Sequence, residues 1–484
     1  MSNQTRQHVI LVVVAAALFM ENLDSTVLVT ALPTIAADLG TDPIRLKLAL
    51  TTYLVSLAVF APASGWVADR FGARRVFTLA ICLFCFASAL CSLANSLPAL
   101  VAARALQGVG GALMLPVGRL VVLRLVPKHE LVGAMAWFTM PALLGPLLGP
   151  PVGGFIVTVA DWRWIFWINL PVGALALIAA HFFLPRIAER DVPPFDRLGF
   201  VLLACCLAAV VAAEAALGGG VHSVVLTAIL VAIALVTGWS YVHHALTTPN
   251  PLLDLKLLGI TTFRVAMLGG LLFRAGSGAT PFLLPLLLQI GLGMSPLASG
   301  FTTFASALGA IMMKPLARPV LDRFGFRRVL VVNVVISCMF MIVPVLFGPA
   351  THWAVMFVVL TLAGLTRSLQ FTAINTLAVA DLTDERQSQG TSFTSVVQQV
   401  SASLGVTIAA LSIEGARTFS GAGPLSTGDF SFAFLVAGAA ALLAAPVFMS
   451  LPKDAGAALI RHRPSRAQAA TGAEGIVTPG SQPK

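Results

Sequence analysis

Two acidic residues stand three positions apart in the first apolar stretch of the chain. Glu21 and Asp24 interrupt a segment that is apolar from residue 8 onward and that resumes its apolar pattern through Ile35. In a helix, residues at positions i and i+3 share one face. Two carboxyl groups this close in a medium of low dielectric constant resist double ionisation, so at least one should bind a proton reversibly. The spacing predicts a proton-binding pair, the plainer alternative being that both side chains face a wet vestibule.

A fixed cation in another apolar stretch could act on this pair. Arg104 is followed by Gln107 three residues later. Because a guanidinium does not release its proton, Arg104 should adjust the proton affinity of a nearby carboxylate or bind an anion. Asp24 is a candidate partner, and Asp24, Glu21 and Arg104 together form the predicted proton-coupling set.

Further polar side chains within apolar stretches are candidate substrate-binding residues. They are Gln107, Arg119, Arg274, Gln289, Lys314, Arg367, Gln370 and Asn375. Fixed cations outnumber the acids in these stretches, so a cavity lined by them should prefer anionic cargo. The alternative is that Arg119 and Lys314 extend towards the membrane surface, where their charges stay hydrated.

The chain shows no pattern typical of a metal, redox or catalytic centre. All six cysteines lie in apolar runs, without histidine or carboxylate at metal-ligand spacing. No set of nucleophile, base and acid is apparent within the apolar stretches. We therefore expect neither an enzyme nor a resident metal or cofactor.

The composition is that of a membrane protein. Of 484 residues, 58% are hydrophobic and 10% are charged, and the mean hydropathy is +0.92. Soluble domains average about 25% charged residues, so a soluble enzyme is excluded. Apolar runs long enough to cross a bilayer recur about fourteen times. They cover residues 9–30, 46–68, 76–96, 98–123, 131–159, 163–184, 197–217, 223–245, 264–290, 297–321, 328–347, 352–378, 391–413 and 429–451.

The basic residues orient these spans. With an even number of spans, both termini lie on one side of the membrane. Twenty of the 30 Lys and Arg residues then fall on that side, four fall on the other, and six lie within spans. Because basic residues concentrate on the cytoplasmic side, both termini are predicted to be cytoplasmic, with residues 452–484 as a disordered tail. The net charge of +10 thus reports topology and does not indicate nucleic-acid binding.

A duplicated loop divides the chain into two halves. Residues 69–75 read DRFGARR and residues 322–328 read DRFGFRR, which are identical at six of seven positions. The copies are eight spans apart, which fits two six-helix halves and two inserted helices. The expected boundaries are 1–190 for the first half, 191–250 for the inserted helices and their linker, and 251–451 for the second half. Parallel halves of this kind are a transporter architecture with the substrate path between them.

Four segments resemble motifs of the major facilitator superfamily, and in particular of its fourteen-helix drug:proton antiporters, the DHA2 group. They are residues 23–33 in the first span, 65–75 after the second, 104–110 in the fourth and 145–154 in the fifth. The resemblance covers nearly the whole chain. It implies an all-α membrane protein of the MFS fold, built from two six-helix halves plus two inserted helices.

The same resemblance implies a function. It is that of a proton-coupled exporter of small molecules, of the multidrug-efflux type, working as a monomer in the bacterial inner membrane with the proton gradient in place of a cofactor. The cations within spans leave open export of an anionic metabolite or of a carboxylate–metal chelate such as a citrate complex. An intramembrane enzyme and a channel are remote alternatives.

Residue roles also follow from the resemblance. Asp24 occupies the family's first-helix aspartate position, so it is favoured as the proton carrier, with Glu21 as modulator. Asp69 should accept hydrogen bonds from the N-terminus of a neighbouring helix, expected to be the thirteenth span, and so hold the outward-open state. Gly65 and Gly72 should allow close helix approach and a tight turn. The full predicted gating set is Gly65, Asp69, Arg70, Gly72, Arg74, Arg75, Asp322, Arg323 and Gly325.

The fifth span carries the segment that resembles the antiporter motif. Its members are Gly145, Pro146, Gly149, Pro150, Gly153 and Gly154. So many Gly and Pro residues weaken a helix unless it packs tightly against a partner. We expect this face to pack on the tenth span, and a generic small-residue packing face is the plainer interpretation.

Overall fold

The computed structural model describes residues 3–125, 131–184, 194–216, 221–383, 386–420, 425–453 and 455–456, and every regular element in them is a helix. The elements before residue 190 are α1 (Asn3–Asp38), α2 (Lys47–Phe71), α3 (Ala73–Ser92), α4 (Leu97–Leu125), α5 (Leu131–Val159), α6 (Trp164–Trp167) and α7 (Asn169–Phe183). Two helices follow, α8 (Arg197–Ala216) and α9 (Val221–Thr247). The remaining elements are η1 (Leu255–Gly259), α10 (Thr261–Ser277), α11 (Thr280–Leu286), η2 (Leu287–Gly291), α12 (Pro296–Phe324), α13 (Phe326–Ile342), η3 (Val343–Leu346), α14 (Trp353–Ala378), α15 (Gln387–Ser420), α16 (Thr427–Leu442) and α17 (Ala444–Met449).

These helices fall where the apolar runs predict them. Twelve segments of the described chain are long and apolar enough to cross a membrane, and two shorter apolar helices cover residues 144–159 and 197–213. Together they match the fourteen predicted spans. Helices α1 and α15 extend furthest beyond the predicted spans, from Asn3 to Asp38 and from Gln387 to Ser420. The chain is a multi-pass membrane protein.

The duplicated loop has the same backbone conformation in both copies. Helix α2 ends at Phe71, Gly72 has a φ of 88°, and α3 begins at the next residue. In the second copy, Gly325 has a φ of 75° between α12 and α13. Both angles lie in the left-handed region, which glycine adopts without steric cost. The tight turn predicted at Gly72 is confirmed, and we call the end of the bundle that carries both turns the motif end.

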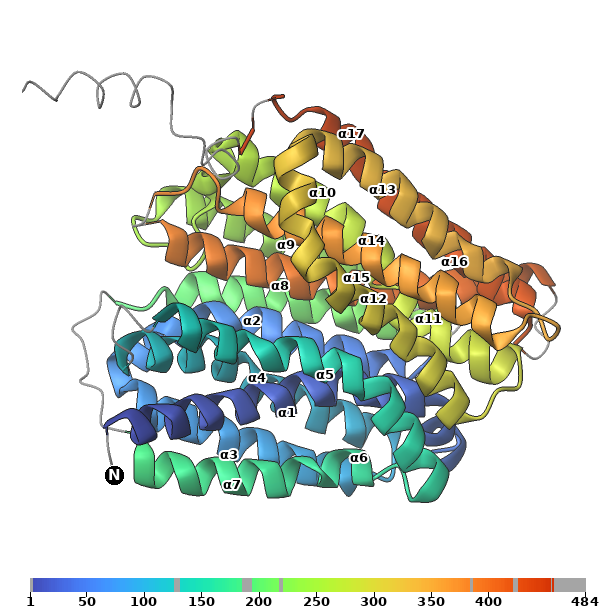
Figure 1. Ribbon diagram of the computed structural model, residues 1–484, viewed down its shortest axis with the longest axis horizontal. Coiled ribbons are helices and arrows are strands. Elements are labelled where there is room, and N and C mark those ends of the chain that lie inside the picture. Colours follow the sequence, from blue (N-terminus) through green and yellow to red (C-terminus); the bar gives the residue numbers. More distant parts are fainter. Residues whose placement is uncertain are drawn as a thin grey trace, which may run out of the picture.

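Helices from the two parts of the chain pack across one another. In Figure 1 the helices before residue 190 (blue to teal) lie below, and those after residue 250 (yellow to red) lie above. Helix α5 packs on α12, and α2 packs on α15. We call these two contacts the seams. Each seam joins a helix of the part before residue 190 to a helix of the part after residue 250.

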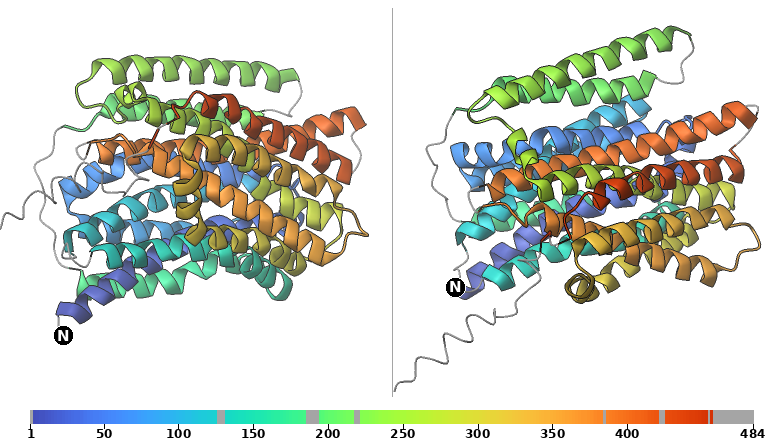
Figure 2. Two further views of the ribbon diagram at one scale, coloured as in Figure 1. Left: turned by 45° about the horizontal axis from the view of Figure 1, so that its top comes forward. Right: turned by 90° about the horizontal axis from the view of Figure 1, so that it is seen from above.

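Helices α8 and α9 lie together at one side of the bundle (Figure 2). Large apolar side chains of α9, among them Leu235 and Trp239, are exposed, as expected for a helix that faces lipid. Asp196 precedes α8 and accepts hydrogen bonds from the Gly199 amide at 2.8 Å, the His244 ring at 2.7 Å and the Leu252 amide at 3.0 Å. One carboxylate thus ties the start of α8 to α9 and to the chain that follows it.

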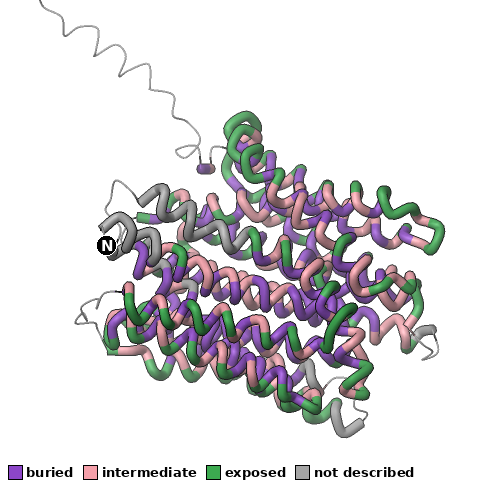
Figure 3. The backbone as a smooth tube through the Cα atoms, turned by 60° about the horizontal axis from the view of Figure 1, so that its bottom comes forward, coloured by how far each residue is buried: buried purple, intermediate pink, exposed green. Residues whose placement is uncertain are grey.

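Ion pairs join the two parts at the end opposite the motif end, which we call the far end. Arg417 Nη1 lies 3.0 Å from Asp42 Oδ2, and Lys47 Nζ lies 3.7 Å from Glu414 Oε1. A continuous hydrophobic core also crosses between the parts here. A second cluster joins Val55, Ala58 and Val59 of α2 to helices after residue 250, and a third lies within the part before residue 190. Along the helices, buried and exposed residues alternate, so each helix has an inward and an outward side (Figure 3).

Candidate functional site

The Asp24 side chain is completely buried and lies within hydrogen-bond distance of three donors. Arg104 Nη1 lies 2.5 Å from Oδ2, and Gln107 Nε2 and Asn169 Nδ2 lie 2.9 and 2.7 Å from Oδ1. Ser88 Oγ closes the network, since it accepts from Gln107 at 2.7 Å and from Asn169 at 3.2 Å. Asp24 thus accepts three hydrogen bonds, one of them a charge-assisted bond from a guanidinium.

Arg104 is itself held in a defined position. Its side chain is completely buried, and its guanidinium stacks 4.0 Å above the Tyr53 ring. Nη1 also donates to Gln107 Oε1 at 2.6 Å. Nη2 has no hydrogen-bond partner in the described part of the chain. Arg104 therefore neutralises Asp24 and keeps one donor group for a second acceptor.

Glu21, in contrast, has no ion-pair partner among the residues that the structure describes. The residue is 9% exposed, and Oε2 is buried without a hydrogen-bond partner among the described residues. A methyl group placed on Gly111 would lie 3.2 Å from Tyr53 Oη and 3.6 Å from Glu21 Cγ. The two side chains thus meet over Gly111, and the Tyr53 hydroxyl also lacks a partner within the described ranges. Burial without a counter-charge disfavours a carboxylate and favours a neutral carboxylic acid.

Small residues of α5 set the position of α1, which carries both acids. Gly145, Gly149 and Gly153 recur every four residues, and a side chain at each would collide with Asn22, Thr26 or Thr30 of α1. The Thr26 hydroxyl donates to the Gly145 carbonyl at 3.3 Å. The predicted antiporter motif therefore packs chiefly on α1.

The predicted contact of the fifth span with the tenth is also present. Gly154 lies against the backbone of Pro296 at the start of α12, and Gly300 of α12 lies against Pro150. Pro146 is half-buried on the same helix, which stays continuous through this segment. The Gly and Pro residues predicted this smaller contact, whereas the more extensive contact is with α1.

A second buried cation lies after residue 250. Arg274 of α10 is 6% exposed and donates from Nη2 to Asn375 Oδ1 at 2.6 Å, while Nη1 has no partner among the described residues. Gln398 Nε2 donates to the same Asn375 oxygen at 3.1 Å, and the Phe371 ring lies 5.5 Å from the guanidinium. The structure thus brings together two of the predicted substrate-binding residues, Arg274 and Asn375.

The other predicted substrate-binding residues are dispersed. Gln107 belongs to the Asp24 network. Gln289 Nε2 donates to the Thr30 carbonyl of α1 at 2.9 Å, so it joins the two parts of the chain. Gln370 is fully buried and bonds to Asn333 and to the Leu330 carbonyl of α13. Its hydrogen bonds are therefore satisfied by helix packing.

Two cations and the gating set complete the predicted residues. Lys314 is exposed on α12, and the Arg119 side chain lies outside the described residues. Arg74 Nη2 donates to the His181 carbonyl at 2.6 Å, and Arg318 Nε lies 3.8 Å from Asp322 Oδ2. Asp69 is half-buried at the end of α2, and four charged members of the gating set are exposed, namely Arg70, Arg75, Asp322 and Arg323. Gly65 is also exposed with open space around it, so the expected close helix approach at Gly65 is wrong for this structure.

Three members of the buried network escaped the sequence analysis. Ser88, Tyr53 and Asn169 all lie within apolar helices and contact the Asp24–Arg104 pair or its partners. Polar side chains in spanning segments are rare and mark functional positions. Asn169, which follows the apolar run WIFWI, carried that signal.

Comparisons with known proteins agree with this architecture. The family model of the Major Facilitator Superfamily matches residues 14–280 and 266–478. A relative from Enterobacter sp. (strain 638), named "Putative multidrug resistance protein MdtD", is 42% identical over 404 residues, covering 82% of this chain and 84% of the relative. A protein of the same name from Citrobacter koseri is 40% identical over 453 residues, covering 91% and 94%.

Solved structures share the fold at low identity. A crystal structure of the peptide transporter POT in complex with sulfate has a TM-score of 0.69 and 15% identity, covering 94% of this chain and 99% of that one. A crystal structure of a D-xylose-proton symporter has a TM-score of 0.66 and 14% identity, covering 93% and 99%. At such identity the likeness establishes the arrangement of helices alone.

Proposed function

The chain belongs to the major facilitator superfamily, and on that premise we propose that it is a proton-coupled exporter of small molecules, of the multidrug-efflux type. Its relatives are named for multidrug resistance. The observation that carries the proton coupling is the contrast between two buried carboxyls on one face of α1, one paired and one unpaired. Such a pair gives an exporter one fixed charge and one exchangeable proton.

We assign the proton to Glu21. The sequence analysis favoured Asp24, but Asp24 accepts from Arg104, Gln107 and Asn169, and its protonation would cost those interactions. Glu21 has no such donors in the described part of the chain, so it can gain or lose a proton as its access to water changes.

The two seams supply the conformational change. The far end is closed by the Asp42–Arg417 and Lys47–Glu414 pairs, which must break for that end to open. The Gly72 and Gly325 turns lie at the motif end, where the predicted gating residues would take over the contacts. The concentration of basic residues on that side supports a cytoplasmic motif end, with both termini cytoplasmic in the inner membrane. We propose that the exporter works as a monomer.

The positions of two arginines bear on whether the cargo is anionic. Arg274 and Arg367, which raised the option of an anionic metabolite or a citrate-like chelate, are both held inside the helices after residue 250. Arg274 bonds to Asn375, and Arg367 borders a cavity of about 30 Å³. That cavity is too small for a chelate of several carboxylates beside Arg367. The names of the relatives favour the broad exporter.

Transport in proteoliposomes tests the proposal. With an imposed pH gradient, the wild-type protein should move a lipophilic cationic dye against its concentration gradient. Glu21→Gln should lose this gradient-driven movement by at least about tenfold, the loss expected when an essential proton-transfer group is removed, and should still exchange labelled for unlabelled dye. Competition by organic anions and by lipophilic cations reports the preferred charge of the cargo.

Asp38→Asn is the matched control. It removes a carboxylate from the exposed end of the same helix, where Asp38 pairs with Arg163 at 3.0 Å. Asp38→Asn should transport like the wild type. Gradient-driven transport at the wild-type rate in Glu21→Gln would refute the assignment of the proton, and failure of the pH gradient to drive any dye or anion would refute the exporter.

A further inference from the structure

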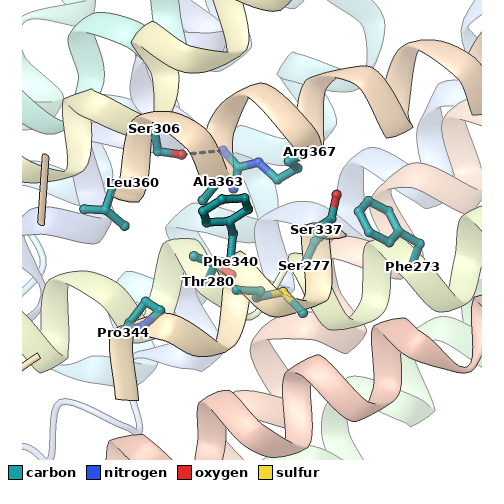
Figure 4. Close-up of a pocket in the computed structure, with 11 residues that line it drawn as sticks. Phe273, Ser277, Thr280, Ser306, Ser337, Phe340, Pro344, Leu360, Ala363 and Arg367 are labelled. Atoms are coloured by element: carbon teal, nitrogen blue, oxygen red, sulfur yellow. Dashed lines mark hydrogen bonds between the residues drawn. The ribbon is translucent and has the colours of Figure 1, made fainter. Parts of the chain in front are cut away.

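A small cavity lies within the helices that follow residue 250. Its polar lining comprises Ser277 from α10, Thr280 from α11, Ser306 from α12, Ser337 from α13 and Arg367 from α14 (Figure 4). Its volume is about 30 Å³. One water needs roughly 10–15 Å³ by this kind of measure, so the cavity has room for one small ion or for one or two waters.

The Arg367 guanidinium brings a permanent positive charge to this cavity. Nη2 donates to Ser306 Oγ at 3.0 Å, which fixes the direction of the side chain. A guanidinium does not deprotonate in proteins, and an unpaired charge at membrane depth is costly. Arg367 therefore requires a negative partner.

The sequence of these helices supplies no carboxylate at that depth. Between residues 261 and 449 the acids are Asp322, Asp381, Asp384, Glu385, Glu414 and Asp429. Asp322 lies two residues before the end of α12, and Asp429 lies in the first turn of α16. Glu414 pairs with Lys47 at the far end, and the other three lie in or beside the connection between α14 and α15. Neither the buried Arg274 nor the half-buried Arg367 has an acid as its partner among the described residues.

Two hydroxyl groups at the cavity complete a set of donors. Ser277 is 3% exposed and Ser337 is 6% exposed, and neither Oγ has a hydrogen-bond partner in the described ranges. Buried polar side chains are nearly always hydrogen-bonded, so each exception needs an explanation. A serine hydroxyl can donate to an anion while its rotation is otherwise free.

We propose that this cavity binds one small monovalent anion, of halide size, between the Arg367 guanidinium and the Ser277 and Ser337 hydroxyls. The anion neutralises Arg367 and also reduces the repulsion from Arg274, which lies one turn before Ser277 on α10. The cavity volume of about 30 Å³ suits a single small ion rather than an organic cargo molecule. The site is a resident anion site and is independent of the proposed export function.

Thermal unfolding at different halide concentrations tests the proposed anion site. The purified protein in lipid nanodiscs is heated while its tryptophan fluorescence is recorded, with chloride or bromide replaced stepwise by gluconate at constant ionic strength. A ligand that binds only the folded state raises the unfolding midpoint as its concentration increases. The wild-type midpoint should rise with halide and saturate, and crystals grown in bromide should give an anomalous peak at Arg367.

Variants separate the site from a general salt effect. Arg367→Gln should abolish the halide dependence, and Ser277→Ala or Ser337→Ala should weaken halide affinity by roughly tenfold, as expected for one hydrogen bond to a charged group. Arg318→Gln is the matched control, because its side chain is 81% exposed near the motif end of α12; it should respond to halide like the wild type.

Two results would overturn the proposal. A wild-type midpoint that does not change when halide replaces gluconate would mean that the cavity holds water only. A halide response that persists in Arg367→Gln, or in both serine variants should Arg367→Gln fail to fold, would place the anion elsewhere. The measurement does not use transport, so failure of dye export leaves the outcome for this site unchanged.

Discussion

Substitution of Asp24 by asparagine tests the central ion pair most directly. The change removes one charge from a pair whose side chains are both completely buried and leaves Arg104 charged without its partner. Removing one member of a buried pair costs about 3–5 kcal/mol, because the remaining charge stays buried without compensation. An asparagine could keep a bond from Asn169 or Gln107, but its amide group would present a donor where Arg104 already donates.

The double variant Asp24→Asn/Arg104→Gln removes both charges. It should be more stable than Asp24→Asn alone, since no unpaired ion is left in the core. Contacting residues couple by about 0.5–3 kcal/mol in such cycles. The free energy of unfolding is measured by titration with a denaturing detergent in mixed micelles, with tryptophan fluorescence as the signal.

The same substitution at Asp38 gives the reference. Asp38 also pairs with an arginine at 3.0 Å, but its side chain is 44% exposed, and exposed pairs contribute about 1 kcal/mol or less. We expect Asp24→Asn to be destabilised several times more than Asp38→Asn. Equal losses of stability in Asp24→Asn and Asp38→Asn would refute the buried pair as described. So would a double variant Asp24→Asn/Arg104→Gln whose loss equals the sum of the losses in Asp24→Asn and Arg104→Gln.

Two further predictions concern helix packing and pH. Gly149→Ala should lower the free energy of unfolding by about 1–3 kcal/mol, because a side chain at Gly149 collides with Thr26. Gly65→Ala should be neutral or stabilising, because Gly65 has open space around it. Unfolding of the two variants, measured side by side, checks this difference. For Asp196, burial alone would raise the pKa, but hydrogen bonds from the Gly199 amide, the His244 ring and the Leu252 amide outweigh it and hold the pKa below its ordinary value of 3.8. A carboxyl group whose pKa is lowered in the folded state stabilises the fold above its unfolded-state pKa, and this stabilisation is lost as the pH falls through its folded-state pKa. Asp196→Asn should therefore unfold more easily near neutral pH and show a shallower loss of stability below pH 3.8. An unchanged pH profile of the unfolding midpoint in Asp196→Asn would contradict this account.

The sequence predicted the helices and turns well, because their causes are local. Apolar runs set the spans, and a glycine between two helices set each turn, as Gly72 and Gly325 show. Contacts between helices depend on which faces meet, and spacing along the chain does not determine that. The sequence predicted a contact between Asp24 and Arg104. Gln107 and Asn169 also donate to Asp24, because α4 and α7 pack on α1, and spacing along the chain does not predict that packing.

The same limit explains the interpretations that changed. Gln370 reads as a polar group inside a span, yet its amide is satisfied by α13. Asp24 matches a family position, yet its three hydrogen-bond donors shift the proton to Glu21 in our proposal. The sequence shows that cations outnumber acids within the spans. The structure distinguishes Arg104, which pairs with an acid, from Arg274 and Arg367, which bond to neutral side chains.

The pairing of Asp24 with Arg104 also sets the electrical character of transport. The pair is neutral overall, so under the proposed assignment of the proton to Glu21 this cluster would carry one proton per cycle. Exchange of that proton for a monovalent cation moves no net charge, and the pH difference alone drives it. Exchange for a neutral molecule moves one positive charge with the proton, and the membrane potential then adds about 2.3 kcal/mol for each 100 mV. The same exporter would thus concentrate neutral and cationic cargo to different extents across one energised membrane.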